Sequence, residues 1–235
     1  MSTIRRVVPS SGLLALLAAF VFVSLSVLPA AAASPVAAPG QPVTALAAAT
    51  ATLTAEEQAG LVFMREEEKL AHDVYLVLYE QWGLVAFRNI AGAELRHTSA
   101  VVTLLNRYGI ADPAAELGAG EFSIPELQDL YATLVVQGSE SLEAALGVGA
   151  TIEEVDIKDL DDLLASGVAA DVNRVYTHLR NGSASHLRAF DRLIERESGV
   201  VWVPQVLTNE EYAAIAGGSA GNRAAARGNR GRNRP

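Results

Sequence analysis

Two side chains that can bind the same metal ion lie three residues apart in the segment Glu94-Leu-Arg-His97. On a helix, this spacing puts a carboxylate and an imidazole on one face. Glu94 and His97 also lie on a stripe of apolar residues at steps of three and four, whose other members are Phe87, Ile90, Val101, Leu104 and Tyr108. Because burying such groups without partners costs several kcal/mol, roughly, we expect partners for both.

The apolar stripes of three other segments carry acids or histidines near their middles. Together the four segments give one inward-facing set: Glu67, Glu94, His97, Glu153, Asp156 and His186. Carboxylates gathered in one dry layer repel one another unless cations neutralise them. Carboxylate and imidazole ligands suit iron or manganese. The pattern therefore predicts two divalent metal ions, iron or manganese, with no catalytic residue assigned beyond these ligands.

The neighbours of these residues are interpreted differently. In Glu66-Glu67-Glu68 the middle acid is expected to point inward, Glu66 outward and Glu68 to lie near the boundary. The remaining polar residues are expected to pack or to face solvent: Glu154, His72, His178, Tyr75, Tyr79, Tyr176, Asp159, Asp161 and Asp162.

The elements that hold the predicted ligands are helical throughout. Capping boxes at Thr54-Ala-Glu-Glu57, Ser123-Ile-Pro-Glu126 and Thr208-Asn-Glu-Glu211 begin three helices. The expected spans are about 54–82, 86–108, 123–137, 139–167 and 170–197, followed by a last short helix from 208. Only Gly199 to Val206 has some strand-like composition, and it contains Pro204.

The lengths of the connections predict how the helices are joined. Short links join the first two long helices and the last two. A long link that carries its own short helix joins the two pairs. This is the connectivity of a four-helix bundle with one long crossover, so the predicted fold class is all-α.

Four stretches of the chain resemble the ferritin-like superfamily, and more closely a branch of exported bacterial proteins with a ferritin-like domain of unknown function. They are Phe63–Tyr75, Glu94–His97, Ile152–Leu160 and His186–Phe190, within a resemblance that covers about 53–212. The resemblance implies a rubrerythrin-like bundle with a di-metal, usually di-iron, centre. In it, Glu67, Glu94, His97 and His186 correspond to ligands of the first, second and fourth helices, and Glu153 and Asp156 to the doubled acids of the third.

The chain departs from the superfamily pattern on the fourth helix. There the superfamily carries Glu-x-x-His, whereas this chain has Ser183 in the carboxylate position before His186. A bridging ligand is therefore lost unless Asp156 replaces it. The departure favours a weaker or asymmetric site in which one metal is held firmly.

The flanking segments predict export. Residues 1–33 resemble a signal peptide, with Arg5 and Arg6 ahead of an apolar run, and an uncleaved membrane anchor is the alternative. Residues 34–51 are expected to be an Ala/Pro-rich linker, 52–216 the helical domain and 217–235 a disordered Gly/Asn/Arg tail. The expected location is therefore secreted, periplasmic or in the cell envelope, after passage through the export machinery.

Composition narrows the function classes. The chain has no cysteine, which excludes disulfides and thiolate metal sites. All 27 acidic residues lie between the signal segment and the tail, together with only 11 of the 18 basic ones, so nucleic acid is not an expected partner.

Several functions remain open at this point. The first is an oxidoreductase that reacts with oxygen or peroxide at a di-metal centre. The alternatives are a metal-binding or scavenging protein without turnover, and a non-catalytic envelope scaffold. A buried hydrogen-bonded network without metal is the structural alternative to the site itself, and a homodimer is one open assembly.

Overall fold

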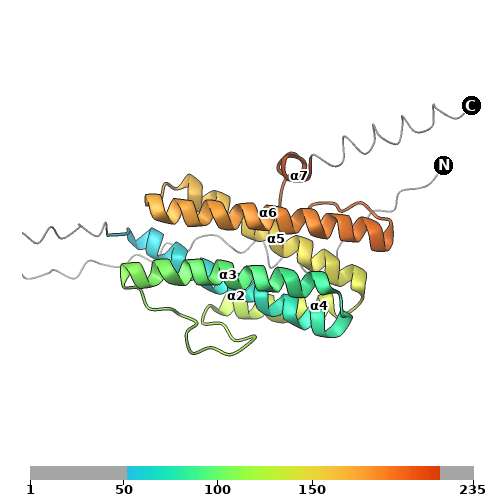
Figure 1. The fold of residues 1–235 in the computed structure, drawn as a ribbon, viewed down its shortest axis with the longest axis horizontal. Coiled ribbons are helices and arrows are strands. Elements are labelled where there is room, and N and C mark those ends of the chain that lie inside the picture. Colours follow the sequence, from blue (N-terminus) through green and yellow to red (C-terminus); the bar gives the residue numbers. More distant parts are fainter. Residues whose placement is uncertain (1–51, 218–235) are drawn as a thin grey trace, which may run out of the picture.

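The computed structural model describes residues 52–217. The predicted signal peptide (1–33), the linker (34–51) and all of the predicted tail except Gly217 lie outside these residues. The described part is all-helical, as predicted, and contains no β-strand (Figure 1). Its helices are α2 (Ala55–Trp82), α3 (Val85–Tyr108), α4 (Pro125–Gly138), α5 (Leu142–Ala165), α6 (Ala170–Ser198) and α7 (Asn209–Ala216).

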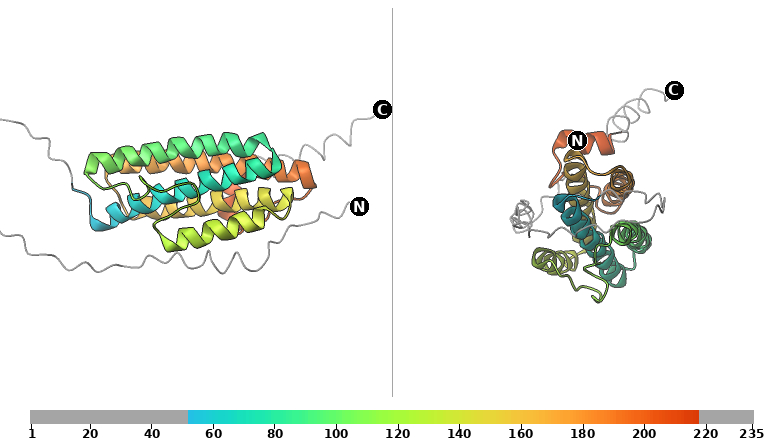
Figure 2. Two further views of the ribbon diagram at one scale, coloured as in Figure 1. Left: turned by 90° about the horizontal axis from the view of Figure 1, so that it is seen from below. Right: turned by 90° about the vertical axis from the view of Figure 1, so that its left-hand side faces the viewer.

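Four long helices lie side by side along the length of the molecule (Figure 2). Helix α2 packs along α3, and α5 packs along α6. The two pairs meet where α2 contacts α5 and α3 contacts α6. The long connection between α3 and α5 carries α4, which packs on α2 and α5 and so covers the outer side of both. No helix within 52–217 combines the length and the apolar character needed to cross a bilayer.

Local sequence signals begin and end most of these helices. Thr54 and Glu57 form the predicted capping box of α2, and Thr208 caps α7 in the same way. Gly83 ends α2 with a positive φ of 66°, a conformation that glycine adopts at little cost. The predicted boundaries of α2 and α3 therefore agree with the structure to within a residue or two.

The capping box predicted at Ser123 is not formed. Helix α4 begins at Pro125, and both the backbone N–H of Ser123 and its hydroxyl donate to the carboxylate of Glu66 on α2. The N–H of Ile124 donates to the same carboxylate at 3.1 Å. Glu66 is consequently fully buried, and the expectation that it points outward to solvent is wrong. It faces away from the bundle interior but is covered by the crossover that it anchors.

Glu154 of α5 anchors the C-terminal loop in a similar way. Its carboxylate accepts hydrogen bonds from Trp202 Nε1 at 2.6 Å and from the backbone N–H groups of Gln205, Val206 and Leu207 at 2.8–3.1 Å. The prediction that Glu154 faces away from the bundle holds only in the sense that its partners lie outside the four long helices. Its side chain is buried because the loop covers it.

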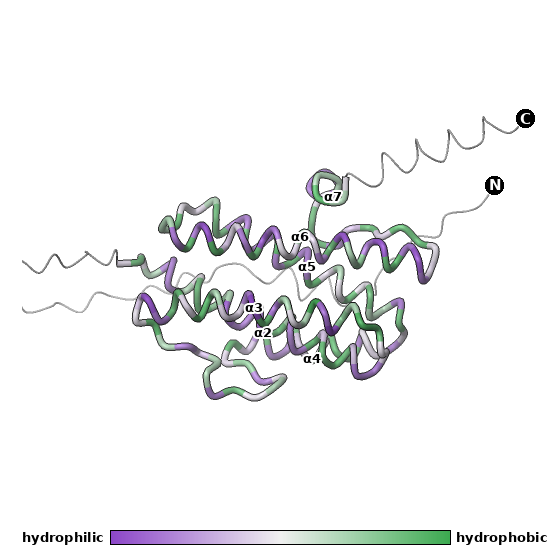
Figure 3. Tube along the Cα trace, viewed as in Figure 1, coloured by the Kyte–Doolittle hydropathy of each residue, from purple (hydrophilic) through white to green (hydrophobic). Residues whose placement is uncertain are grey.

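The apolar core is divided in two along the helix axes. One cluster contains Tyr75, Phe87 and Phe190, and the other contains Leu61, Val101 and Tyr176. Between the clusters, each long helix places polar residues in the interior, and the hydropathy of all four helices alternates along their length (Figure 3). The apolar clusters thus enclose a polar layer from both ends.

The anchoring contacts of Glu154 lead to a stability prediction. Replacement by alanine, Glu154→Ala, removes the acceptor of four donors and leaves them poorly satisfied. We expect the free energy of unfolding to fall by about 3 kcal/mol in urea denaturation followed by circular dichroism. Exposed Glu140, replaced by alanine as the control, should change it by less than about 0.5 kcal/mol. Equal effects of the two substitutions would contradict this assignment.

Candidate metal centre

The carboxylate of Glu94 lies at the centre of the polar layer. Its Oε2 is 2.7 Å from Nδ1 of His97, one turn further along α3. Its Oε1 is 2.8 Å from Nδ1 of His186 on α6. The two imidazole rings stack with their centroids 5.8 Å apart. One buried carboxylate therefore spans both histidines of the layer.

Two groups of metal-ligating atoms share this carboxylate. Glu68, Glu94 and His97 offer ligand atoms that all lie within 4.8 Å of one another. Glu94, Glu153 and His186 do the same, with Glu153 Oε2 at 3.5 Å from His186 Nδ1. Each group contains two carboxylates and one imidazole. The arrangement provides two adjacent ligand sets with Glu94 common to both.

Tyr75 fixes the orientation of Glu153. Its hydroxyl donates to Glu153 Oε1 at 2.6 Å and lies 3.3 Å from the carbonyl oxygen of Gly149. The ring is fully buried and packs against Phe87 and Phe190. Tyr75 is packed, as predicted, and its hydroxyl also bonds the carboxylate of a predicted ligand, which is the alternative role that the sequence left open for this tyrosine.

Asp156 lies in the same layer, next to Ser183 of α6. The hydroxyl of Ser183 donates to Asp156 Oδ2 and also lies 3.0 Å from the carbonyl oxygen of Leu179. The charge of Asp156 raises the pKa of Glu68 and of His97, so it lies near the first ligand set. Asp156 thus lies next to both ligand sets while Ser183 holds one of its oxygens.

Glu67 lies apart from the two ligand sets. Its carboxyl group lies next to that of Asp159 on α5, whose proximity adds to burial in raising the pKa of Glu67. Its buried Oε2 has no hydrogen-bond partner among residues 52–217. Four of the six predicted ligands, Glu94, His97, Glu153 and His186, are therefore brought together. Asp156 lies beside them, and Glu68 occupies the first-helix position for which Glu67 was predicted.

The periodicity of α2 contains a signal for Glu68. Besides the stripe that includes Glu67, a second stripe at steps of three and four runs through six residues that are all buried: Leu61, Met64, Glu68, Ala71, Tyr75 and Leu78. Helix α2 contacts α3, α4 and α5, so it is buried on more than one face. Two equally apolar stripes result, and the sequence gives no ground for choosing between them.

The other histidines and the acids near the end of α5 lie mostly at the surface, with Asp159 as the exception. His178 is exposed, as predicted, and its ring lies edge-on to that of His97 at 6.0 Å. His72 contacts Asp73 at 2.9 Å. Asp161 and Asp162 are paired with basic residues at the surface. The expectation of a solvated face is wrong for Asp159, because its Oδ2 is buried next to Glu67.

Glu94, His97 and His186 shift one another's pKa values because they lie so close together. Burial raises the pKa of Glu94, but the contacts with His186 and His97 outweigh it and lower that pKa to about 2. Burial lowers the pKa of His186, but the charges of Glu153 and Glu94 outweigh it and raise that pKa to about 10. The pKa of His97 is raised for the same reason. These contacts therefore favour the ionised form of Glu94 and the protonated form of His186.

Burial raises the pKa values of the other carboxyl groups of the layer. The pKa of Asp156 is raised to about 8, mainly by burial. The hydrogen bond from Ser183 lowers this pKa, and the charge of Glu153 raises it further. Burial and the charges of Asp156 and Glu94 raise the pKa of Glu68 well above its ordinary value. Burial and Glu94 raise that of Glu153. The layer therefore contains more carboxylates than its two histidines can neutralise.

Unsatisfied atoms show that the donor set fits a cation. Four polar atoms in the layer are buried and have no hydrogen-bond partner among residues 52–217: Glu68 Oε1, Glu94 Oε1, Asp156 Oδ1 and His186 Nδ1. Glu94 Oε1 and His186 Nδ1 are 2.8 Å apart, yet their geometry is not that of a hydrogen bond. Buried polar atoms nearly always have a hydrogen-bond partner. These oxygen and nitrogen atoms have none, and they are of the kinds that could coordinate a metal ion.

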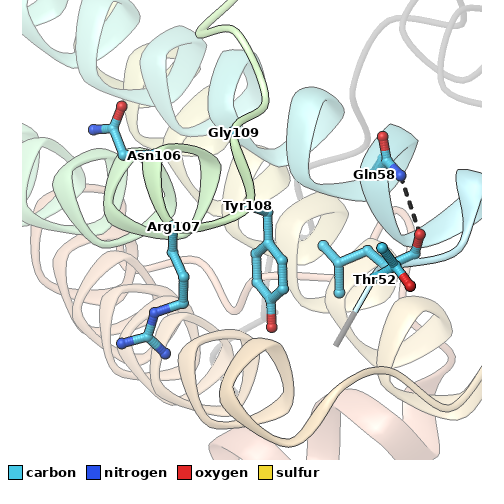
Figure 4. A pocket seen from close by; sticks show the side chains of 7 residues that line it. Thr52, Gln58, Asn106, Arg107, Tyr108 and Gly109 are labelled. Atoms are coloured by element: carbon cyan, nitrogen blue, oxygen red, sulfur yellow. Dashed lines mark hydrogen bonds between the residues drawn. The ribbon is translucent and has the colours of Figure 1, made fainter. Parts of the chain in front are cut away.

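A pocket that could hold a small ligand lies elsewhere. It has a volume of about 370 Å³ and is lined by residues near the start of α2 and the end of α3: Thr52, Leu53, Gln58, Asn106, Arg107, Tyr108 and Gly109 (Figure 4). Gln58 closes part of it by donating to the carbonyl oxygen of Leu53. This lining contains no carboxylate and no histidine. The chemistry-bearing residues are instead enclosed between the helices.

Comparison with known proteins identifies a family and a relative that match most of this chain. The family described as "Uncharacterized protein domain (DUF2202)" matches residues 57–218. The uncharacterized protein MJ0754 of Methanocaldococcus jannaschii is 45% identical over 167 residues, which are 71% of this chain and 90% of the relative. The crystal structure of the hypothetical protein MJ0754 from Methanococcus jannaschii DSM 2661 matches with a TM-score of 0.68 at 42% identity, covering 77% of this chain and 98% of that one.

The packing of His97 against α6 predicts that Gly182→Ala disturbs the site. A Cβ atom at Gly182 would lie 2.6 Å from Cε1 and Nε2 of His97, so the imidazole must move. We expect a loss of about 1–3 kcal/mol in the free energy of unfolding. The control is Gly92→Ala on α3, where the nearest atom lies at 4.0 Å and helix propensity favours alanine by up to about 1 kcal/mol. Stabilisation by both substitutions would contradict the close contact.

The raised pKa values predict a pH dependence for the metal-free protein. Folding raises the pKa of Asp156 from 3.8 to about 8 and that of His186 from 6.5 to about 10, so the folded state keeps protons that the unfolded chain releases. Urea denaturation in the presence of a chelator should therefore show stability falling from about pH 5 to about pH 9. Glu94, with a pKa of about 2, contributes only at lower pH. A stability that rises with pH across this window would contradict the assignment.

Proposed function

The chain belongs to the family of the uncharacterized domain DUF2202, and we propose that its buried layer binds two divalent metal ions. The observation that carries this proposal is the pair of ligand sets that share Glu94, with polar atoms left unpaired in a dry interior. A hydrogen-bonded network without metal is the competing interpretation. It is disfavoured because the contact between Glu94 Oε1 and His186 Nδ1 is short but is not a hydrogen bond.

The proposed ligands follow the two sets. Glu68, Glu94 and His97 would hold one ion, and Glu94, Glu153 and His186 the other. Glu94 would bridge them with its two oxygens, each of which faces a different imidazole. All of these ligand atoms are oxygen or nitrogen, which suits iron, with manganese as the alternative.

Asp156 is the proposed substitute for the missing carboxylate of the fourth helix. Ser183 holds its Oδ2, and its buried Oδ1 finds no hydrogen-bond partner in the described chain. A carboxylate from α5 would thus serve where Ser183 leaves a gap on α6. This assignment retains Asp156 in the ligand set, in a supporting position, and moves the first-helix ligand from Glu67 to Glu68.

We also propose that the domain is a ferritin-like four-helix bundle with a rubrerythrin-like di-metal centre. Four long helices that each contribute to one central layer support this classification. Iron bound at such a centre supplies electron transfer to oxygen or peroxide. The protein residues would bind and orient the metal: His97 and His186 would release their protons, and Tyr75 would hold Glu153 in place.

A specific observation favours binding without turnover as the second candidate. The site has a serine at the fourth-helix carboxylate position, and its substitute Asp156 is tied by a hydrogen bond. A metal site with one constrained ligand can hold an ion firmly and still react slowly. In both candidates the protein acts outside the cytoplasm, a proposal that rests on the signal peptide predicted at 1–33, and metal ions with oxygen or peroxide are its partners.

The proposed function is tested by metal uptake. Protein purified without oxygen and loaded with ferrous iron should retain about two ions per chain after desalting, as measured by elemental analysis. Glu94→Ala should lose both ions because it belongs to both ligand sets, whereas Glu68→Gln should lose one. Glu80→Gln, an exposed acid on the same helix as Glu68, should retain two.

Oxygen and peroxide consumption by the loaded protein then separates the two candidates. Faster oxidation of iron than in buffer would support the oxidoreductase, and stable binding without oxidation would support the scavenger. A wild-type protein that retains no iron and no manganese would refute both.

A further inference from the structure

Glu67 is a buried acid that the proposed centre does not use. Its side chain is 6% exposed and its Oε2 has no hydrogen-bond partner within residues 52–217. It points to the seam between α2 and α5, next to a pocket of about 10 Å³ that is otherwise lined by apolar residues and by Thr151. That volume accommodates about one water molecule. A carboxylate in such surroundings is costly unless a proton or a cation accompanies it.

Asp159 extends this feature toward the surface. Its carboxyl group lies next to that of Glu67, and its buried Oδ2 has no hydrogen-bond partner among residues 52–217. The residue is partly exposed, whereas Asp156, one turn earlier on α5, is buried. Two adjacent carboxyl groups with unpaired oxygens, one near solvent and one inside, therefore lie at the same seam.

Asp156 connects this pair to the centre. Its charge raises the pKa of Glu67 on one side and that of Glu68 on the other, so it lies close to both acids. Glu153, Asp156 and Asp159 follow one another at intervals of three residues on α5 and share a face. Unpaired buried oxygens occur on all three acids, of which Asp159 is partly exposed and Glu67 and Asp156 are buried.

We propose that Glu67 and Asp159 form a transit site for divalent cations, which pass from solvent to the metal centre by way of Asp156. This inference rests on the proposed function. The pair offers only two carboxylates, fewer than the three ligand residues that each set of the centre provides. Weak coordination suits transit, because an ion that is held too firmly would not move on.

The test measures how fast and how far metal-free protein takes up Co²⁺, which accepts the same ligand types as iron. Protein is mixed with CoCl₂ at neutral pH, uptake is stopped at timed intervals with excess EDTA, and bound cobalt is determined after desalting. Glu67→Gln and Asp159→Asn should slow uptake by about tenfold, since they remove the charges that concentrate cations at the seam. The final cobalt content should equal that of the wild type.

Matched variants make the result specific. Asp162→Asn is the control on α5, because Asp162 is exposed and paired with Lys158, and it should load at the wild-type rate. Glu68→Gln should lower the final content instead of the rate, since it belongs to a ligand set. Circular dichroism verifies that each variant is folded, and partly exposed Asp159 provides the test if Glu67→Gln does not fold.

The outcomes separate the transit site from the centre itself. Slow loading to full content supports transit. Loading of both variants at the wild-type rate overturns the transit site and leaves the centre in place. Loss of one ion at the end point in Glu67→Gln also overturns transit, because Glu67 would then be a ligand. A wild-type protein that binds no cobalt refutes the proposed centre and, with it, this inference.

Discussion

The contact of one buried carboxylate with two imidazoles is the interaction on which the rest of the structure depends. Glu94 meets His97 within α3 and His186 across the bundle on α6, both at less than 3 Å. Around it lie more buried acids than these histidines can neutralise. Such a layer is tolerable inside a protein only if protons or cations compensate it. The raised pKa values of Glu68, Glu153 and Asp156 describe the first solution, and the shared ligand sets point to the second.

The remainder of the domain keeps this layer dry and in register. Apolar clusters close it from both ends of the helices. Two further acids, Glu66 and Glu154, have no place in the layer but anchor the crossover and the C-terminal loop, which cover the outer faces of α2 and α5. Small residues allow the close contacts: a Cβ at Gly149 would lie 2.4 Å from the ring of Phe190, and Gly182 leaves room for His97. The packing of the helices therefore also holds the polar side chains of the layer in place.

Ser183 of α6 holds Asp156 of α5 within the polar layer by a hydrogen bond. An acid from α5 thus lies beside α6, at the position where the resemblance to the ferritin-like superfamily predicts a carboxylate from α6 itself. Asp156 also lies near Glu67, so the acids of the layer and those between α2 and α5 are neighbours.

The sequence by itself determined the helices, their order and the inward-facing polar residues of α3 and α6. Helix α3 shows one stripe clearly because its other side faces solvent, so Glu94 and His97 could be identified from spacing alone, and His186 followed from the same spacing on α6. Only the tertiary structure showed that Glu68, and not Glu67, lies within reach of Glu94 and His97, and that Glu66 and Glu154 are covered. The physical reason is that α2 and α5 each contact three other helices. A helix that is buried on several sides has several apolar faces, and its periodicity no longer tells which acid faces which neighbour.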